Sequence, residues 1–219
     1  MTAAELLSHH IPFLQKTDNV LFAKDIMIEH HVTELPVSEE QKYIGMVFED
    51  DIEDADDLTT IEKYIQTNNL PKVYPTDFFL VPLKIMQQQK LRLLPVVKED
   101  NELLGVITDD ELLHAASFYN AADVPGGVII LQMLPNNFYI SEIGRIIESN
   151  NAKIIHLNTW SDPATGELRV AIKVNKNDIQ DILASFERYN YNIVQYFGEN
   201  LSETELKQNF DHLMNYLNI

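Results

Sequence analysis

The acidic run Glu49–Asp57 reads EDDIEDADD and holds seven carboxylates in nine residues, the densest group of side chains that could do chemistry. Clustered carboxylates suit hard cations such as Mg²⁺ and Ca²⁺. A calcium loop of the EF-hand type counted from Asp50 needs a glycine at its sixth position and a glutamate at its twelfth, but Ala55 and Ile61 stand there. We therefore interpret the run as a solvated helix start and loop, and we expect no metal site.

Two pairs of histidines also invite a metal interpretation. His30 and His31 are adjacent, and adjacent residues do not share a helix face, so the pair is a poor chelate. A histidine at the C-terminal end of a helix is instead favourable for the helix dipole. The second pair, His9 and His10, has no partner that the sequence shows. We expect structural roles for these residues.

The sequence carries no recognisable catalytic motif. It has no Walker loop, no G-x-S-x-G segment and no H-E-x-x-H segment. It also has no cysteine, which excludes a disulfide scaffold, a thiolate metal site and a cysteine nucleophile. The seven glycines are scattered, with Gly126-Gly127 as the only pair, so loops that could hold phosphate are scarce. We predict no catalytic residues and a protein that is not an enzyme.

The charge of the chain disfavours several partners. Its 219 residues include 34 acidic and 16 basic side chains, a net charge of −18, and such a field repels nucleic acid and anionic lipid. No stretch approaches the ~20 apolar residues of a membrane span. The first residues lack the basic start and apolar run of a signal peptide. We expect a cytoplasmic protein that binds neither nucleic acid nor membrane.

An internal duplication supplies the elements that would position functional residues. Residues 17–40 repeat as residues 76–99, with nine identities in 24 positions. The offset of 59 then becomes 60, which pairs Gly45 with Gly105. Each copy predicts a helix capped by Thr-Asp, a short strand, an acidic turn, a second strand and an acidic helix start. A unit of about 55 residues buries too little surface alone, so the copies should pack on each other.

The first helix of each copy is expected to turn one apolar face toward the core. The residues of these two faces are Leu21, Ile26 and Met27 in the first copy, and Leu80, Ile85 and Met86 in the second.

The repeated pattern resembles the cystathionine β-synthase (CBS) domain, which occurs in pairs known as Bateman modules. The resemblance lies in the order of helix, apolar-Pro-Val strand, acidic turn and G-h-h-T-x-x-D segment, and it covers roughly residues 3–118. It implies CBS repeat 1 at residues 1–58 and CBS repeat 2 at residues 59–120. Members of the family usually sense adenine nucleotides or related ligands between the copies, and they often dimerise.

In that family, the Thr and Asp of the motif help to hold phosphate and ribose. A hydroxyl donates to a phosphate oxygen, and a carboxylate accepts from sugar hydroxyls. The second copy keeps Thr108 but has Glu111 in place of the Asp, while the first copy keeps Asp51 but has Phe48 in place of the Thr. The leucine–proline pairs of the two first strands are further candidate binding residues: Leu35, Pro36, Leu94 and Pro95.

The acidic surroundings restrict the ligand, because an unscreened polyphosphate would be repelled. We expect a neutral or cationic ligand, a nucleoside, or an adenine nucleotide carried with Mg²⁺, and no other cofactor. The alternative is a pair of degenerate CBS sites that have lost their ligand.

Residues 121–199 predict a second domain. Strands at 128–133, 153–160, 168–174 and 191–197 are interleaved with two amphipathic helices in a βαββαβ order, a ferredoxin-like fold. This order resembles the ACT domain, which commonly binds amino acids at a dimer interface. A CBS pair followed by an ACT-like domain resembles the acetoin-utilisation type of bacterial protein. Asn136 and Asn137, after the first strand, are candidate contacts for an amino acid, or simply turn residues.

Residues 200–219 predict a terminal amphipathic helix that begins with a capping box at Ser202–Glu205. Its apolar face packs either on its own chain or on a dimer partner. The sequence as a whole predicts an α/β (α+β) protein that is a ligand-sensing regulatory homodimer, with a small-molecule effector and an unidentified protein target. The alternative is a ligand-free interaction and dimerisation scaffold.

Overall fold

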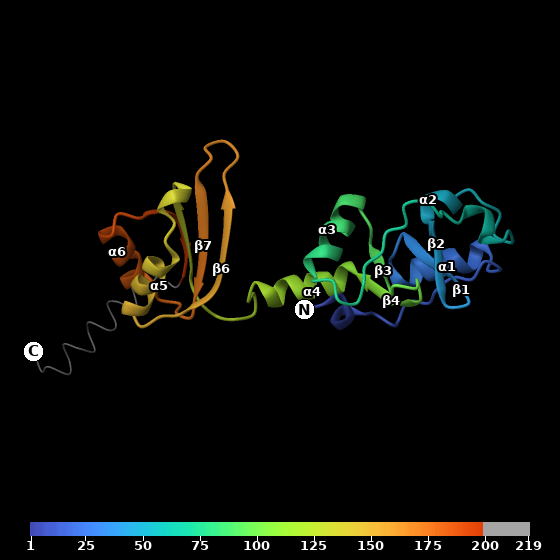
Figure 1. Cartoon of the computed structure of the whole chain (residues 1–219), viewed down its shortest axis with the longest axis horizontal. Coiled ribbons are helices and arrows are strands. Elements are labelled where there is room, and N and C mark those ends of the chain that lie inside the picture. The colour runs from blue at the N-terminus through green and yellow to red at the C-terminus, as the bar shows by residue number, and fades with distance from the viewer. Residues whose placement is uncertain (199–219) are drawn as a thin grey trace, which may run out of the picture. The chain divides into compact units, whose positions relative to one another are not determined.

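The computed structural model describes residues 1–198 and divides the chain into two compact units (Figure 1). The first unit is Met1–Tyr119, and the second begins at Asn120. The predicted terminal helix at residues 200–219 lies outside the described residues. Within residues 1–198, no helix combines the length and the apolar character that crossing a membrane requires.

The first unit begins with copy 1 of the repeat. Helix α1 (Val20–His30) leads into an antiparallel hairpin of β1 (Glu34–Glu39) and β2 (Lys42–Phe48), which is followed by the short helix α2 (Glu49–Ile52). Five of the six residues of β1 are buried, and three consecutive residues near the end of β2 are buried as well. The hairpin therefore forms the centre of the copy rather than an edge.

Copy 2 repeats this order. It contains α3 (Leu80–Gln89), β3 (Leu93–Val97), β4 (Leu103–Thr108) and α4 (Asp109–Tyr119), and β3 pairs with β4 in antiparallel register. Both hairpins carry a register shift at the corresponding place, just before the turn. The duplication in the sequence is therefore a duplication of structure.

At their C-terminal ends, helices α1 and α3 agree with the structural role predicted for the histidine there. At their N-terminal ends, the capping residues differ from the prediction. His31 and Lys90 both adopt left-handed backbone angles, with φ of 55° and 57°, and their N–H groups bond back to the helix. Helix α1, however, is capped by Asn19, which accepts from Phe22 N at 2.8 Å. The predicted cap, Asp18, instead accepts from Gln15 N at 2.7 Å, because a short carboxylate can close the turn before a helix as readily as cap it.

The apolar faces of these helices are also narrower than predicted. Ile26, Met27 and Met86 are buried, but Leu21 and Leu80 are 43% and 45% exposed, so the prediction that they reach the core is wrong. Each of these leucines lies in the first turn of its helix. The exposed leucines leave apolar surface on the outside of the unit.

The segment that precedes each copy crosses to the other copy. The 3₁₀ helix η1 (Ala3–Leu6) packs in the core of copy 2, and Ser8 then forms a bridge with Val106 of β4. The 3₁₀ helix η2 (Ile61–Tyr64) instead contributes Ile61 to the core of copy 1. Each core is therefore completed by a segment that belongs to the other copy in sequence.

These crossing segments explain the glycine that each copy carries in its second strand. A Cβ atom on Gly45 would lie 2.6 Å from the carbonyl oxygen of Gln66 and 2.3 Å from a side-chain carbon of Ile65. A Cβ atom on Gly105 would lie 3.1 Å from the carbonyl oxygen of Ser8. Glycine is needed here because the crossing backbone passes directly over the strand.

The second unit has one four-stranded antiparallel sheet in the order β6–β7–β5–β8, with α5 and α6 beside it (Figure 1). Its elements in chain order are β5 (Val128–Met133), η3 (Pro135–Asn137), α5 (Ile140–Ser149), β6 (Ile154–Ser161), β7 (Leu168–Val174), α6 (Gln180–Arg188) and β8 (Asn192–Phe197). Alternate residues of β5 and β7 are buried with Ile143, Ile146 and Ile147 of α5. The predicted βαββαβ ferredoxin-like fold is confirmed.

Candidate functional site

Thr108 and Glu111 lie together where β4 passes into α4. The backbone N–H of Thr108 donates to Glu111 Oε2 at 3.0 Å, and the Thr108 hydroxyl bonds to the same oxygen. Both residues are half-buried. The longer side chain of glutamate therefore folds back to close the first turn of α4, and it engages the hydroxyl that the resemblance to the CBS family predicts to contact a ligand.

The corresponding residues of copy 1, Phe48 and Asp51, each have a different partner. Asp51 is exposed in α2, and its Oδ2 atom accepts from the side-chain amide of Gln66 at 2.6 Å. Gln66 belongs to the segment that crosses into copy 1, where it exchanges two backbone hydrogen bonds with Met46. Phe48 is half-buried and packs against the cores of both copies. At these two motif positions copy 1 therefore has one carboxylate, that of Asp51, and it already accepts a hydrogen bond from Gln66.

The structure places the two predicted leucine–proline pairs in the core: Leu35, Pro36, Leu94 and Pro95. The prolines act through their carbonyl oxygens. Pro36 O accepts from Leu14 N at 2.9 Å, and Pro95 O accepts from Val73 N at 3.0 Å. These contacts hold the incoming chain against the first strand of each copy.

A buried carboxylate that sequence reasoning missed lies between the copies. Glu34, at the start of β1, is 1% exposed, and its Oε1 atom accepts from the backbone N–H groups of Arg92 and Leu93 at 2.6 and 2.7 Å. Its Oε2 atom accepts from the Thr33 hydroxyl at 2.6 Å. Burial raises the pKa of Glu34 even though these hydrogen bonds oppose the shift. An acid directly before a buried apolar strand was the available signal.

The acidic run Glu49–Asp57 lies mostly on the surface. Lys24 of α1 donates hydrogen bonds to the Glu53 carbonyl at 3.1 Å and to Asp57 at 3.3 Å. The ammonium group of Lys24 therefore compensates part of the negative charge of the run. Nowhere in residues 1–198 do three His, Asp or Glu side chains come together in a way that could hold a metal ion.

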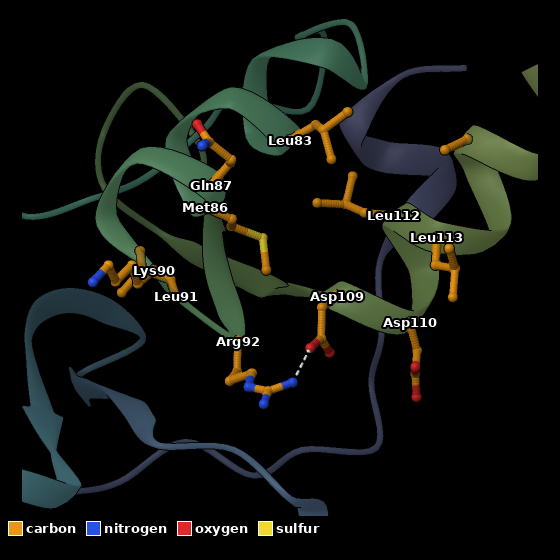
Figure 2. A pocket seen from close by; sticks show the side chains of 11 residues that line it. Leu83, Met86, Gln87, Lys90, Leu91, Arg92, Asp109, Asp110, Leu112 and Leu113 are labelled. Atoms are coloured by element: carbon orange, nitrogen blue, oxygen red, sulfur yellow. Dashed lines mark hydrogen bonds and ion pairs between the residues drawn. The ribbon is translucent and has the colours of Figure 1, made fainter.

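A cavity of about 550 Å³ opens between α3 and α4 of copy 2 (Figure 2). Leu83 and Met86 of α3 and Leu112 of α4 give it an apolar lining. At its edge, Arg92 Nη1 pairs with Asp109 Oδ2 at 2.8 Å, as the dashed line in Figure 2 shows. This cavity was not predicted from the sequence, and of its apolar lining only Leu83 and Met86 come from residues 80–89.

The predicted pair in the second unit is divided by the structure. Asn136 and Asn137 are both exposed in η3, but only Asn137 lines a second cavity, of about 340 Å³. The other walls of that cavity come from the ends of β5 and α6 and from the start of α5.

Two copies of one helix–hairpin–helix unit, each completing the core of the other, define a tandem module rather than two separate domains. The family model for the CBS domain matches this chain twice, at residues 3–57 and 61–117. The chain belongs to the CBS domain family, and the predicted tandem CBS pair is confirmed. CBS pairs are regulatory, ligand-sensing modules.

Similar proteins include an inosine-5'-monophosphate dehydrogenase from Korarchaeum cryptofilum, 33% identical over 100 residues. That match covers 46% of this chain and only 21% of the enzyme. A solved CBS domain pair/ACT domain protein from Thermotoga maritima is 20% identical with a TM-score of 0.49, and the match covers 53% of this chain and 96% of that one. The CBS domains of a transcriptional regulator from Streptococcus pneumoniae are 26% identical with a TM-score of 0.48, covering 52% and 98%.

Proposed function

We propose that this chain is a non-catalytic regulatory protein whose CBS pair senses an adenosine-type ligand at Thr108 and Glu111. The observation that carries the proposal is the contact between this hydroxyl and this carboxylate in a half-buried position. A ribose offers both a hydroxyl donor for the carboxylate and an acceptor for the threonine. A bound nucleoside would therefore replace one internal hydrogen bond with two of its own.

The charges around Thr108 favour a nucleoside, or a nucleotide with Mg²⁺, over a free polyphosphate. Asp109, Asp110 and Glu111 follow Thr108 directly in the first turn of α4. The nearby cation, Arg92, is already paired with Asp109. An uncompensated phosphate would thus meet more negative than positive charge.

The position of the site suggests how binding would be read out. Thr108 directly precedes α4, and α4 carries Leu112 and Leu113 into the 550 Å³ cavity. A ligand that draws Glu111 away from Thr108 changes the start of this helix and hence the surface of the cavity. Such a ligand shifts the equilibrium between two positions of α4 by its differential affinity for them.

A thermal-shift panel tests the proposal with adenosine, AMP, ADP, ATP with Mg²⁺, S-adenosylmethionine and amino acids. A true ligand at one hundred times its Kd should add about 2.7 kcal/mol of stability. The shift should be lost in Thr108→Ala and kept in the control Thr159→Ala, an exposed threonine of β6. A shift that survives in Thr108→Ala would move the site elsewhere.

The alternative function is a scaffold with degenerate sites, and the contacts of copy 1 favour it. Asp51 is tied to Gln66, and Phe48 occupies the position where the family has a hydroxyl. If no compound in the panel changes the melting temperature, the scaffold is the better description. Substitution of Asp51 by Asn shows whether copy 1 takes part, because it affects binding only if copy 1 holds a ligand.

We further propose that the α3–α4 surface is where the chain pairs with a second copy of itself. CBS-pair proteins commonly dimerise. Leu83 and Leu113, which line the apolar cavity, leave 36% and 67% of their surfaces exposed, and Leu80 and Val81 of α3 leave 45% and 40% exposed. Exposed apolar surface of this kind is typical of a protein interface. Ligand binding at Thr108 would then alter the dimer through α4.

A further inference from the structure

Strand β8 forms an open edge of the sheet in the second unit. Within the described residues, the strand order β6–β7–β5–β8 pairs it on one side only, with β5. Its residues, Asn192–Phe197, include no charged side chain and no proline, although such residues commonly protect an edge strand from pairing with another chain. Val194, Tyr196 and Phe197 are 40%, 45% and 54% exposed. An apolar edge of this kind normally has a cover.

A groove lies beside this edge, between β8 and α6. It has a volume of about 310 Å³, and Leu183 of α6 gives it one apolar wall. Ile193, Val194 and Tyr196 of β8 give it the other. Among the described residues that line the groove, Glu187 carries the single formal charge. The α6–β8 groove therefore suits an apolar element that has one positive charge beside it.

The chain leaves β8 at one end of the α6–β8 groove. Gly198 follows the strand directly, and a Cβ atom on it would lie 2.7 Å from the carbonyl oxygen of Asn177. Asn177 lies shortly before the start of α6 at Gln180. Residues 199–219, which lie outside the described residues, therefore begin beside the groove.

The sequence of residues 199–219 fits the groove in pattern and in length. In the helix predicted after Ser202, apolar residues at i, i+4, i+7 and i+11 form one stripe: Leu206, Phe210, Leu213 and Leu217. A helix over residues 203–219 would be about 25 Å long, and the strand β8 spans about 20 Å. Lys207, the only Lys or Arg of the segment, lies beside the stripe on this helix.

We propose that residues 202–219 form a helix that docks its apolar stripe in the α6–β8 groove of its own chain and covers the edge of β8. The tether favours the same chain over a second copy, because a segment joined by a short linker acts at an effective concentration on the order of millimolar. Lys207 then lies near Glu187, while Gln208 and Asn215 face solvent. The sheet edge is thereby closed to pairing with other chains.

A spin-label experiment on the full chain tests this placement. The chain has no native cysteine, so Asn215→Cys gives a nitroxide one attachment point, on the solvent-facing side of the helix. In the ¹⁵N-labelled protein, the nitroxide should broaden the amide signals of Asn192–Val194, at the end of β8 far from Gly198. Amides of β6, at the opposite edge of the sheet, should keep their intensity. Unchanged signals at Asn192–Val194 would overturn the proposal.

Matched charge substitutions in the labelled protein show whether the apolar stripe holds the helix. Leu213→Asp places a carboxylate in the stripe and should lower the docking equilibrium constant by at least about tenfold, as expected for loss of one buried leucine. The broadening at residues 192–194 should decrease accordingly. Gln208→Asp adds the same charge on the opposite side of the helix and should leave the broadening unchanged. Equal broadening in the two variants would contradict docking through the stripe.

A mixed sample distinguishes the same chain from a second copy. Chains that carry the nitroxide at natural isotope abundance are mixed with ¹⁵N-labelled chains that carry none. The proposal expects the signals of residues 192–194 to stay sharp in this mixture. Broadening there would assign the groove to the helix of a second copy and overturn the contact within one chain.

Discussion

Glu34 and Leu93 occupy equivalent positions in the two copies, and the carboxylate of the first accepts a hydrogen bond from the backbone N–H of the second at 2.7 Å. The contact joins the starts of β1 and β3 at the seam between the copies. A leucine side chain has no hydrogen-bond acceptor. The contact therefore depends on the difference between the two copies at this position, glutamate in the first and leucine in the second.

Replacement of Glu34 by the residue of the other copy should therefore destabilise the first unit. Glu34→Leu leaves the N–H groups of Arg92 and Leu93 without their acceptor, which costs about 2 kcal/mol or more. Glu34→Gln keeps an acceptor oxygen and should stay within about 1 kcal/mol of wild type. Native-state hydrogen exchange of peptides from residues 1–119 measures both, and equal protection in the two variants would contradict the assignment.

The same residue predicts a pH dependence. The raised pKa of Glu34 means that the folded state binds its proton more readily than the unfolded state does. Its contribution to stability is therefore largest below the ordinary glutamate pKa and decreases as pH rises through the raised value. The unfolding free energy of wild type minus that of Glu34→Gln should fall between pH 4 and pH 7. A difference that is flat or rises with pH would show that the carboxyl is not destabilised by burial.

Shortening Glu111 tests the ligand site by a change that should strengthen ligand binding rather than abolish it. Glu111→Asp pulls the carboxylate away from the Thr108 N–H and hydroxyl, and it restores the residue type of the family motif. We expect a loss of less than about 1 kcal/mol in the unliganded protein, the size of a helix cap. Adenosine affinity should rise by about tenfold, the value of one freed hydrogen bond. Calorimetric titration decides, and weaker binding than wild type would show that the carboxylate needs the longer reach of Glu111 to contact the ligand.

The proposed dimer contact at the α3–α4 surface can be tested with a charged substitution. Leu113, which is 67% exposed, lines the apolar cavity, and Leu113→Asp should raise the dimer dissociation constant by at least about tenfold. The control Leu58→Asp changes a leucine that is 81% exposed outside the helices of copy 1. Light scattering across a concentration series gives both constants. A dimer that tolerates Leu113→Asp but not Leu58→Asp would place the interface elsewhere.

Two glycines should respond in opposite ways to alanine. Gly45→Ala forces a methyl group against Gln66 and Ile65 and should destabilise copy 1 by about 1–3 kcal/mol, the usual cost of overpacking. In Gly144→Ala the new methyl group meets nothing within 4 Å, and a helical alanine should stabilise α5 by about 0.5–1 kcal/mol. Trp160, the only tryptophan, lies in β6 and reports the second change by fluorescence.

Much of this fold follows from local patterns. The strand pairs of both copies and the βαββαβ order were predictable because alternating or continuous apolar runs were separated by turns. The exposed sides of Leu21 and Leu80 were not, because the helical period cannot say which neighbour covers a face. The crossing of η1 and η2 was invisible for the same reason, since it depends on contacts far apart in sequence.

The candidate site was also predictable from the sequence only in part. The repeat and the family motif identified Thr108 and Asp51 as the retained residues, but not that each already has a hydrogen-bond partner. Glu34 escaped notice because a single acid before a strand normally faces solvent. Its burial results from the packing of two copies, which no single copy encodes.

The crossing of η1 also sets an order of events during synthesis. Ala3–Leu6 must remain without its final partners until β4 has left the ribosome, about one hundred residues later. The core cluster of copy 1, by contrast, consists mostly of residues that have emerged once η2 is complete, and only Leu93, Val97, Leu103 and Val106 join it later. The nascent chain therefore carries an early apolar segment that has to be kept from pairing with a neighbouring chain. Two chains that exchange this segment would form an entangled dimer by the same contacts that complete one molecule.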